Sequence, residues 1–114
     1  MIQIYHNPRC GKSRNCVALL ETNSVQHNLI KYLDTPPTYD ELLILLEKLQ
    51  FAPIDLVRQK EKVWIENYKN QNLSDEEIVN AMVLNPILIE RPIVIKGDKA
   101  IIGRDLATLS EFLK

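Results

Sequence analysis

The chain has 114 residues, 25% of them charged and 46% apolar, and its formal net charge is −1. This length and composition predict one globular domain, residues 1–114, with a single core. The near-zero charge gives no reason to expect nucleic acid or an anionic membrane as a partner. Residues 1–5 have neither the basic leader nor the long apolar core of a signal peptide, and no run reaches the ~18 apolar residues of a membrane span, so we expect a cytoplasmic protein.

The first third of the chain predicts a strand, a helix and a second strand. Apolar residues indicate the first strand over residues 2–5, and Pro8 and Gly11 indicate the turn that follows it. A helical pattern runs from about residue 12 to 22, and a weakly alternating strand covers residues 26–33. Two strands with a helical crossover of this length predict a parallel βαβ unit.

The middle of the chain predicts helices. Two capping boxes, in which Thr or Ser is followed three residues later by Glu, open helices that end near residues 49 and 84: Thr38 with Glu41, and Ser74 with Glu77. Between them, Pro53 suits the first turn of a helix over residues 53–58. Residues 60–72 are polar and predict part helix and part loop.

The last third returns to strands. Residues 93–95 and 100–102 predict a hairpin with a turn at 97–99, and residues 105–113 predict a helix with Leu106, Leu109, Phe112 and Leu113 facing inward. The order β-α-β, then helices, then β-β-α predicts an α/β protein with a thioredoxin-like fold. Its mixed four-stranded sheet is interrupted by a helical insertion at about residues 38–85.

The loop from Tyr5 to Asn15 holds the strongest chemical signal, because it brings Cys10 together with His6 and several cations. Placed at the start of the first helix, Cys10 would meet unpaired backbone N–H groups and the positive end of the helix dipole, which favour a thiolate. The alternative is that Cys10 is a small buried apolar residue. Cys16 falls among the apolar residues of the predicted helix, where a core role is favoured.

The two cysteines are too few for a disulfide scaffold and lack the spacing of a zinc site, so we expect no metal and a reduced compartment. Ser13 stands where many thioredoxin-fold proteins carry the second cysteine of a C-x-x-C pair. Its hydroxyl can donate a hydrogen bond to the thiolate but cannot form a disulfide. A second thiol must therefore come from outside the chain.

Four segments together resemble the glutaredoxin-dependent arsenate reductase family: residues 5–15, 32–38, 56–58 and 85–94. The resemblance implies a thioredoxin-like fold, a catalytic Cys10, and a cis peptide at Arg91-Pro92. It also implies an oxyanion site formed by Arg58, Arg91 and Arg104. Guanidinium groups suit a tetrahedral oxyanion because each can bond two oxygens at once.

The same resemblance implies that arsenate is reduced to arsenite through a Cys10 adduct, with glutathione as co-substrate, glutaredoxin as protein partner and no bound cofactor. We expect His6, Ser13 and Arg14 to stabilise the thiolate. His6 could instead only cap the loop, and Arg58, near a predicted helix end, could be a solvated residue that interacts with the last carbonyls.

Two other functions stay open. The first is a glutathione-dependent thiol oxidoreductase, which would need no set of three arginines. The second is an Spx-like regulator that binds RNA polymerase and senses oxidation through a C-x-x-C pair; Ser13 removes that switch.

Overall fold

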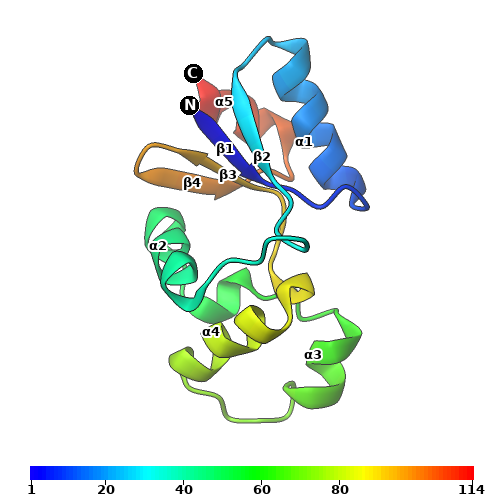
Figure 1. Cartoon of the computed structure of the whole chain (residues 1–114), viewed down its shortest axis with the longest axis vertical. Helices are drawn as coiled ribbons and strands as arrows, with labels where there is room; N and C mark the ends of the chain where they lie inside the picture. The colour runs from blue at the N-terminus through cyan, green and yellow to red at the C-terminus, as the bar shows by residue number, and fades with distance from the viewer. The chain divides into compact units, whose positions relative to one another are not determined.

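A computed structural model describes all residues, 1–114, which form two compact units. The sheet unit consists of Met1–Thr35 and Arg91–Lys114, and the helical unit consists of Pro36–Glu90 (Figure 1). The helical unit extends slightly beyond the insertion expected at 38–85. The single domain expected over residues 1–114 stays a prediction.

The sheet unit contains a mixed four-stranded sheet, as the sequence predicts. Its strands are β1 (Ile2–Tyr5), β2 (His27–Ile30), β3 (Ile93–Lys96) and β4 (Lys99–Ile102), in the order β2-β1-β3-β4. β1 pairs in parallel with β2 and antiparallel with β3, and β3 forms an antiparallel hairpin with β4. Gly97, at φ 63°, takes the left-handed conformation that this turn requires.

The core of this unit lies between the sheet and helices α1 (Gly11–Thr22) and α5 (Leu106–Leu113), which contact each other (Figure 1). Alternating residues of β1 point to this face, where they meet buried side chains from the helices and β3. This cluster consists of Ile2, Ile4, Cys16, Val17, Leu20, Val94 and Leu109. The expectation for the last helix is wrong at Leu106, the first residue of α5, which is 42% exposed.

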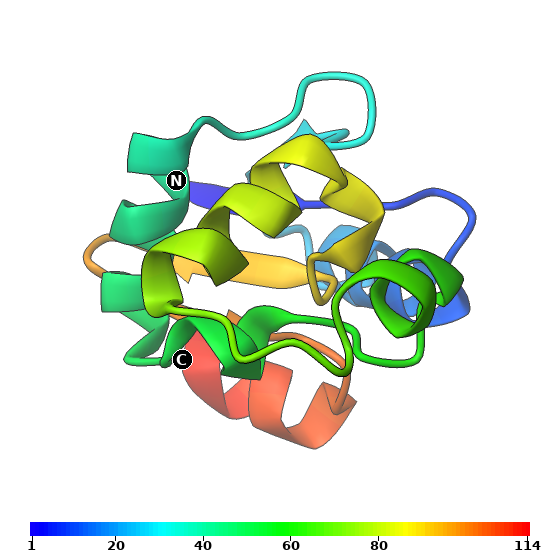
Figure 2. The ribbon, with the colours of Figure 1, turned by 90° about the horizontal axis from the view of Figure 1, so that it is seen from below.

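The helical unit contains three α-helices and two short 3-10 helices (Figure 2). Its elements are α2 (Tyr39–Leu49), η1 (Pro53–Leu56), α3 (Lys62–Asn67), α4 (Asp75–Leu84) and η2 (Pro86–Leu88). Both predicted capping boxes are confirmed, with reciprocal bonds between Thr38 and Glu41 and between Ser74 and Glu77. None of the helices in either unit has the length and apolar character that a membrane crossing requires.

Two predicted elements are shorter in the structure. β2 ends at Ile30 rather than residue 33, because the N–H groups of Asp34 and Thr35 turn back to the Lys31 carbonyl. The helix expected over residues 53–58 is the single 3-10 turn η1. It stops because Val57 becomes extended and pairs with Ile89 across an isolated bridge.

Candidate active site

Cys10 lies at the junction of a tight loop and the first turn of α1. It is the N-cap residue of that helix, with extended backbone angles, and its side chain is half-buried. Its N–H donates to the Asn7 carbonyl at 3.0 Å, and its own carbonyl accepts the Arg14 N–H at 3.0 Å. These two bonds fix the loop to the helix and hold the thiol at the helix N-terminus.

The electrostatic surroundings of Cys10 favour the thiolate. Partial burial is the largest single influence and by itself would raise the pKa of the thiol. The backbone N–H groups of Ser13 and Lys12 and the side chain of Arg91 act in the opposite direction and together prevail, so the pKa lies below its ordinary value of 9.0. A lowered pKa is what a nucleophilic thiol at neutral pH needs.

The Ser13 hydroxyl forms its hydrogen bonds within the loop rather than with the Cys10 sulfur. Ser13 is fully buried, and its Oγ lies 2.8 Å from His6 Nδ1 and accepts the Asn7 N–H at 3.0 Å. The contribution of Ser13 to the Cys10 thiolate comes instead from its backbone N–H. This differs in detail from the sequence-based expectation, which assigned that contact to the hydroxyl.

His6 is buried beside Ser13, and it is not a cation at neutral pH. Burial, followed by the charges of Lys31 and Arg14, lowers the pKa of the imidazole below 6.5. An influence of His6 on the thiolate therefore passes through Ser13 and the loop. Arg14 is exposed on α1 and donates to the Pro8 carbonyl at 3.0 Å, which ties the helix back to the loop.

The three arginines of the expected oxyanion site have different surroundings. Arg91 is 7% exposed, precedes β3, and acts directly on the Cys10 thiol. Its peptide bond to Pro92 is cis, as the resemblance implies. Arg104 is exposed in the turn after β4, in the same unit.

Arg58 belongs to the helical unit, where its N–H donates to the Leu88 carbonyl at 2.7 Å. Its Nε lies 3.6 Å from a Glu61 carboxylate oxygen, is buried, and has no hydrogen-bond partner. The Glu61 carboxylate is close enough for an ion pair but too far for a hydrogen bond, so this Nε–H keeps an unused donor. A place for Arg58 beside Cys10 stays a prediction.

Cys16 has the opposite environment to Cys10. It is fully buried in the sheet-unit core, and burial raises the pKa of its thiol to about 11. It is therefore neutral and inaccessible in the folded protein. The expected core role for Cys16 agrees with this position.

Asn7 is a site residue that sequence reasoning did not single out. It is 3% exposed, and its three groups each bond a different part of the loop: its N–H to Ser13, its carbonyl to the Cys10 N–H, and its side-chain Oδ1 to the Arg9 N–H at 3.0 Å. The Asn-Pro pair after a strand is the signal that could have identified it, because Asn side chains bond the backbone two residues on.

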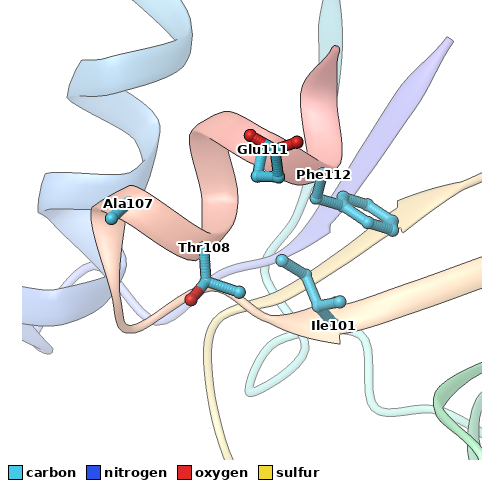
Figure 3. Close-up of a pocket in the computed structure, with 5 residues that line it drawn as sticks. All are labelled: Ile101, Ala107, Thr108, Glu111 and Phe112. Atoms are coloured by element: carbon cyan, nitrogen blue, oxygen red, sulfur yellow. The ribbon is translucent and has the colours of Figure 1, made fainter.

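No group of three or more His, Cys, Asp or Glu side chains is placed to hold a metal ion. A shallow hollow of about 500 Å³ lies over α5 and β4, and its residues are Ile101, Ala107, Thr108, Glu111 and Phe112 (Figure 3). None of the expected site residues lines it.

Comparison with known proteins assigns the family. The chain matches the ArsC family over residues 5–112. An arsenate reductase of Neisseria meningitidis is 40% identical over 114 residues, which cover 98% of this chain and 97% of that protein. The Escherichia coli protein YfgD is 46% identical over 105 residues, which cover 90% of this chain and 88% of YfgD.

A solved structure agrees with both the fold and the family. The arsenate reductase from Vibrio cholerae has a TM-score of 0.90 and 40% identity, and the match covers 96% of this chain and 95% of that one. The thioredoxin-like fold expected from the order of elements is confirmed. The chain belongs to the ArsC family.

Proposed function

We propose that the protein is an arsenate reductase whose nucleophile is Cys10. The observation that carries this proposal is a half-buried thiol at a helix N-terminus whose pKa is lowered by two backbone N–H groups and by Arg91. The arsenate reductases among its relatives support arsenate as the substrate. We further propose that Arg58, Arg91 and Arg104 bind the oxyanion, and that the protein acts in the cytoplasm.

In the first step the Cys10 thiolate attacks arsenic. A sulfur–arsenic bond forms, and one arsenate oxygen takes up two protons and leaves as water. Arsenic stays in its +5 state, so this step transfers no electrons. The Arg91 guanidinium next to the sulfur favours both the thiolate and the approach of an anion, because it offsets their mutual repulsion.

In the second step a thiol from outside the chain attacks the Cys10 sulfur. A disulfide forms, the sulfur–arsenic bond breaks, and its electron pair remains on arsenic, which leaves as arsenite after taking up the proton of the incoming thiol. The chain cannot supply this thiol, because Cys16 is buried in the core and Ser13 is not a cysteine. We propose glutathione as the donor and glutaredoxin as the partner that restores the Cys10 thiol by exchange.

The test measures arsenite formed from arsenate in the presence of glutathione and glutaredoxin. We expect turnover by the native chain, no turnover by Cys10→Ser, and near-native turnover by Cys16→Ser. Activity in Cys10→Ser would refute the nucleophile. Absence of turnover by the native chain, together with glutathione-dependent reduction of a small disulfide, would instead assign a thiol oxidoreductase.

A further inference from the structure

A cavity of about 290 Å³ adjoins the Cys10 loop, and no step of the reduction described above uses it. All of its residues belong to the sheet unit: His6, Asn7, Pro8, Arg9, Lys31, Leu33 and Asp34. We call it the donor pocket. Its volume is close to the lower end of the range found for small-molecule sites, ~300 Å³.

The His6 ring has one nitrogen that the fold does not use. Its Nδ1 faces the Ser13 hydroxyl at 2.8 Å, whereas its Nε2 makes no hydrogen bond within the chain. The residue is only 7% exposed, yet it lines the donor pocket. Nε2 is not one of the fully buried atoms that lack a partner, so this ring nitrogen is accessible from the pocket and available to a ligand.

The hydrogen bonds around Ser13 decide which nitrogen of His6 carries the proton. The Ser13 hydroxyl accepts the Asn7 N–H, so its own proton needs an acceptor, and His6 Nδ1 is its only other partner. Nδ1 of the neutral ring is therefore the acceptor, and the ring proton is on Nε2. The ring thus offers an N–H donor to the pocket, which is the group an anion requires.

The charged side chains of the donor pocket have both signs. Arg9 and Lys31 are cations that line the pocket, and neither forms an ion pair within the chain. Asp34 supplies one carboxylate on the same cavity. Two cations with an N–H donor, next to a single carboxylate, complement a ligand that carries a carboxylate and an ammonium group together.

We propose that the donor pocket binds the α-amino-acid end of the small-thiol reductant. The carboxylate of that end accepts the His6 Nε2 proton between Arg9 and Lys31, and its ammonium group lies against Asp34. Glutathione and free cysteine belong to this chemical class. Four of the pocket residues, His6 to Arg9, belong to the loop that ends at Cys10, so the pocket adjoins the loop that carries the sulfur. The role of the bound thiol as reductant rests on the proposed function, whereas binding to the pocket is independent of it.

Binding is tested with S-methylglutathione, which keeps the charged ends and lacks a free thiol. Titration of the native chain, followed by backbone amide shifts, should move resonances of residues 6–9 and 31–34. Lys31→Gln should weaken binding about fivefold, as expected for one lost charge-assisted contact. Lys99→Gln, which removes an exposed lysine from the β3–β4 hairpin outside the pocket, should leave binding unchanged.

Three results would overturn the proposal: no binding by the native chain, equal weakening in Lys31→Gln and Lys99→Gln, or displacement of S-methylglutathione by arsenate alone, which would make the pocket an oxyanion site. Nitrogen-15 spectra of His6 should show the proton on Nε2, and a proton on Nδ1 would also contradict it. Binding without arsenite production would refute the proposed function but support the donor pocket. Arsenite production without binding would support the proposed function but refute the donor pocket.

Discussion

Replacing Ser13 by alanine separates the two roles that this residue has in the loop. The substitution removes the hydroxyl that bonds His6 Nδ1 and the Asn7 N–H, but it keeps the backbone N–H that acts on Cys10. We therefore expect Ser13→Ala to lower the stability of the protein while leaving the pKa of the Cys10 thiol nearly unchanged.

The cost follows from the burial of the two partners. His6 and Asn7 are 7% and 3% exposed, so each would keep a polar atom without a hydrogen bond. Such an atom costs roughly 1–3 kcal/mol, and the better helix propensity of alanine returns about 0.5 kcal/mol. For the two atoms together, the expected decrease in the free energy of unfolding is therefore about 1.5–5.5 kcal/mol.

Denaturant unfolding measures the stability, and the rate of iodoacetamide reaction as a function of pH measures the pKa of Cys10. Ser110→Ala, an exposed serine of α5, is the matched control; it should leave the Cys10 pKa unchanged and raise the stability by no more than about 0.5 kcal/mol, through helix propensity alone. A clear rise of the Cys10 pKa in Ser13→Ala would refute the reasoning, because it would mean that the hydroxyl itself stabilises the thiolate. A Ser13→Ala variant that is no less stable than Ser110→Ala would refute the buried hydrogen bonds of the Ser13 hydroxyl.

Three further predictions concern packing, ionisation and capping. Gly103→Ala should cost about 1–3 kcal/mol in urea unfolding, because its Cβ would lie 2.9 Å from Val94 Cγ2 and 3.3 Å from Cys16 Sγ; unchanged stability would contradict this packing. The Cys16 thiol titrates near 9 when unfolded and at about 11 when folded, so native stability should fall as pH rises through that range, and Cys16→Ala should remove this part of the slope. Thr38→Ala should lower the free energy of unfolding by about 1 kcal/mol in calorimetry, because the N-cap of α2 loses its bond to the Glu41 N–H. Thr22→Ala, at the C-terminal end of α1, removes no such cap and should cost less.

The features that the sequence predicts well are those set by neighbouring residues. Both capping boxes depend only on a hydroxyl and a glutamate three residues apart, and both form. The hairpin of β3 and β4 follows from two apolar runs around a glycine turn. Local chemistry was also sufficient to place Cys10 at the start of α1.

The features that the sequence predicts poorly depend on partners far along the chain. β2 ends early because of a turn at Lys31, and η1 stops where Val57 pairs with Ile89. Similarly, the Ser13 hydroxyl is directed by the buried His6 and Asn7 rather than by the nearby thiol. Hydrogen-bond competition of this kind is decided by tertiary structure, so residue type and spacing alone do not reveal it.

Cys10, and no other residue, should pass through a covalent intermediate that a small thiol resolves. The most direct measurement is mass spectrometry of the native chain after reaction with arsenate and glutathione, with glutaredoxin left out. We predict a glutathione mixed disulfide on the peptide that contains Cys10, formed only when arsenate is present, in step with arsenite release. Arsenite release without this disulfide, or a disulfide on Cys16 instead, would rule out Cys10 as the residue that a small thiol resolves.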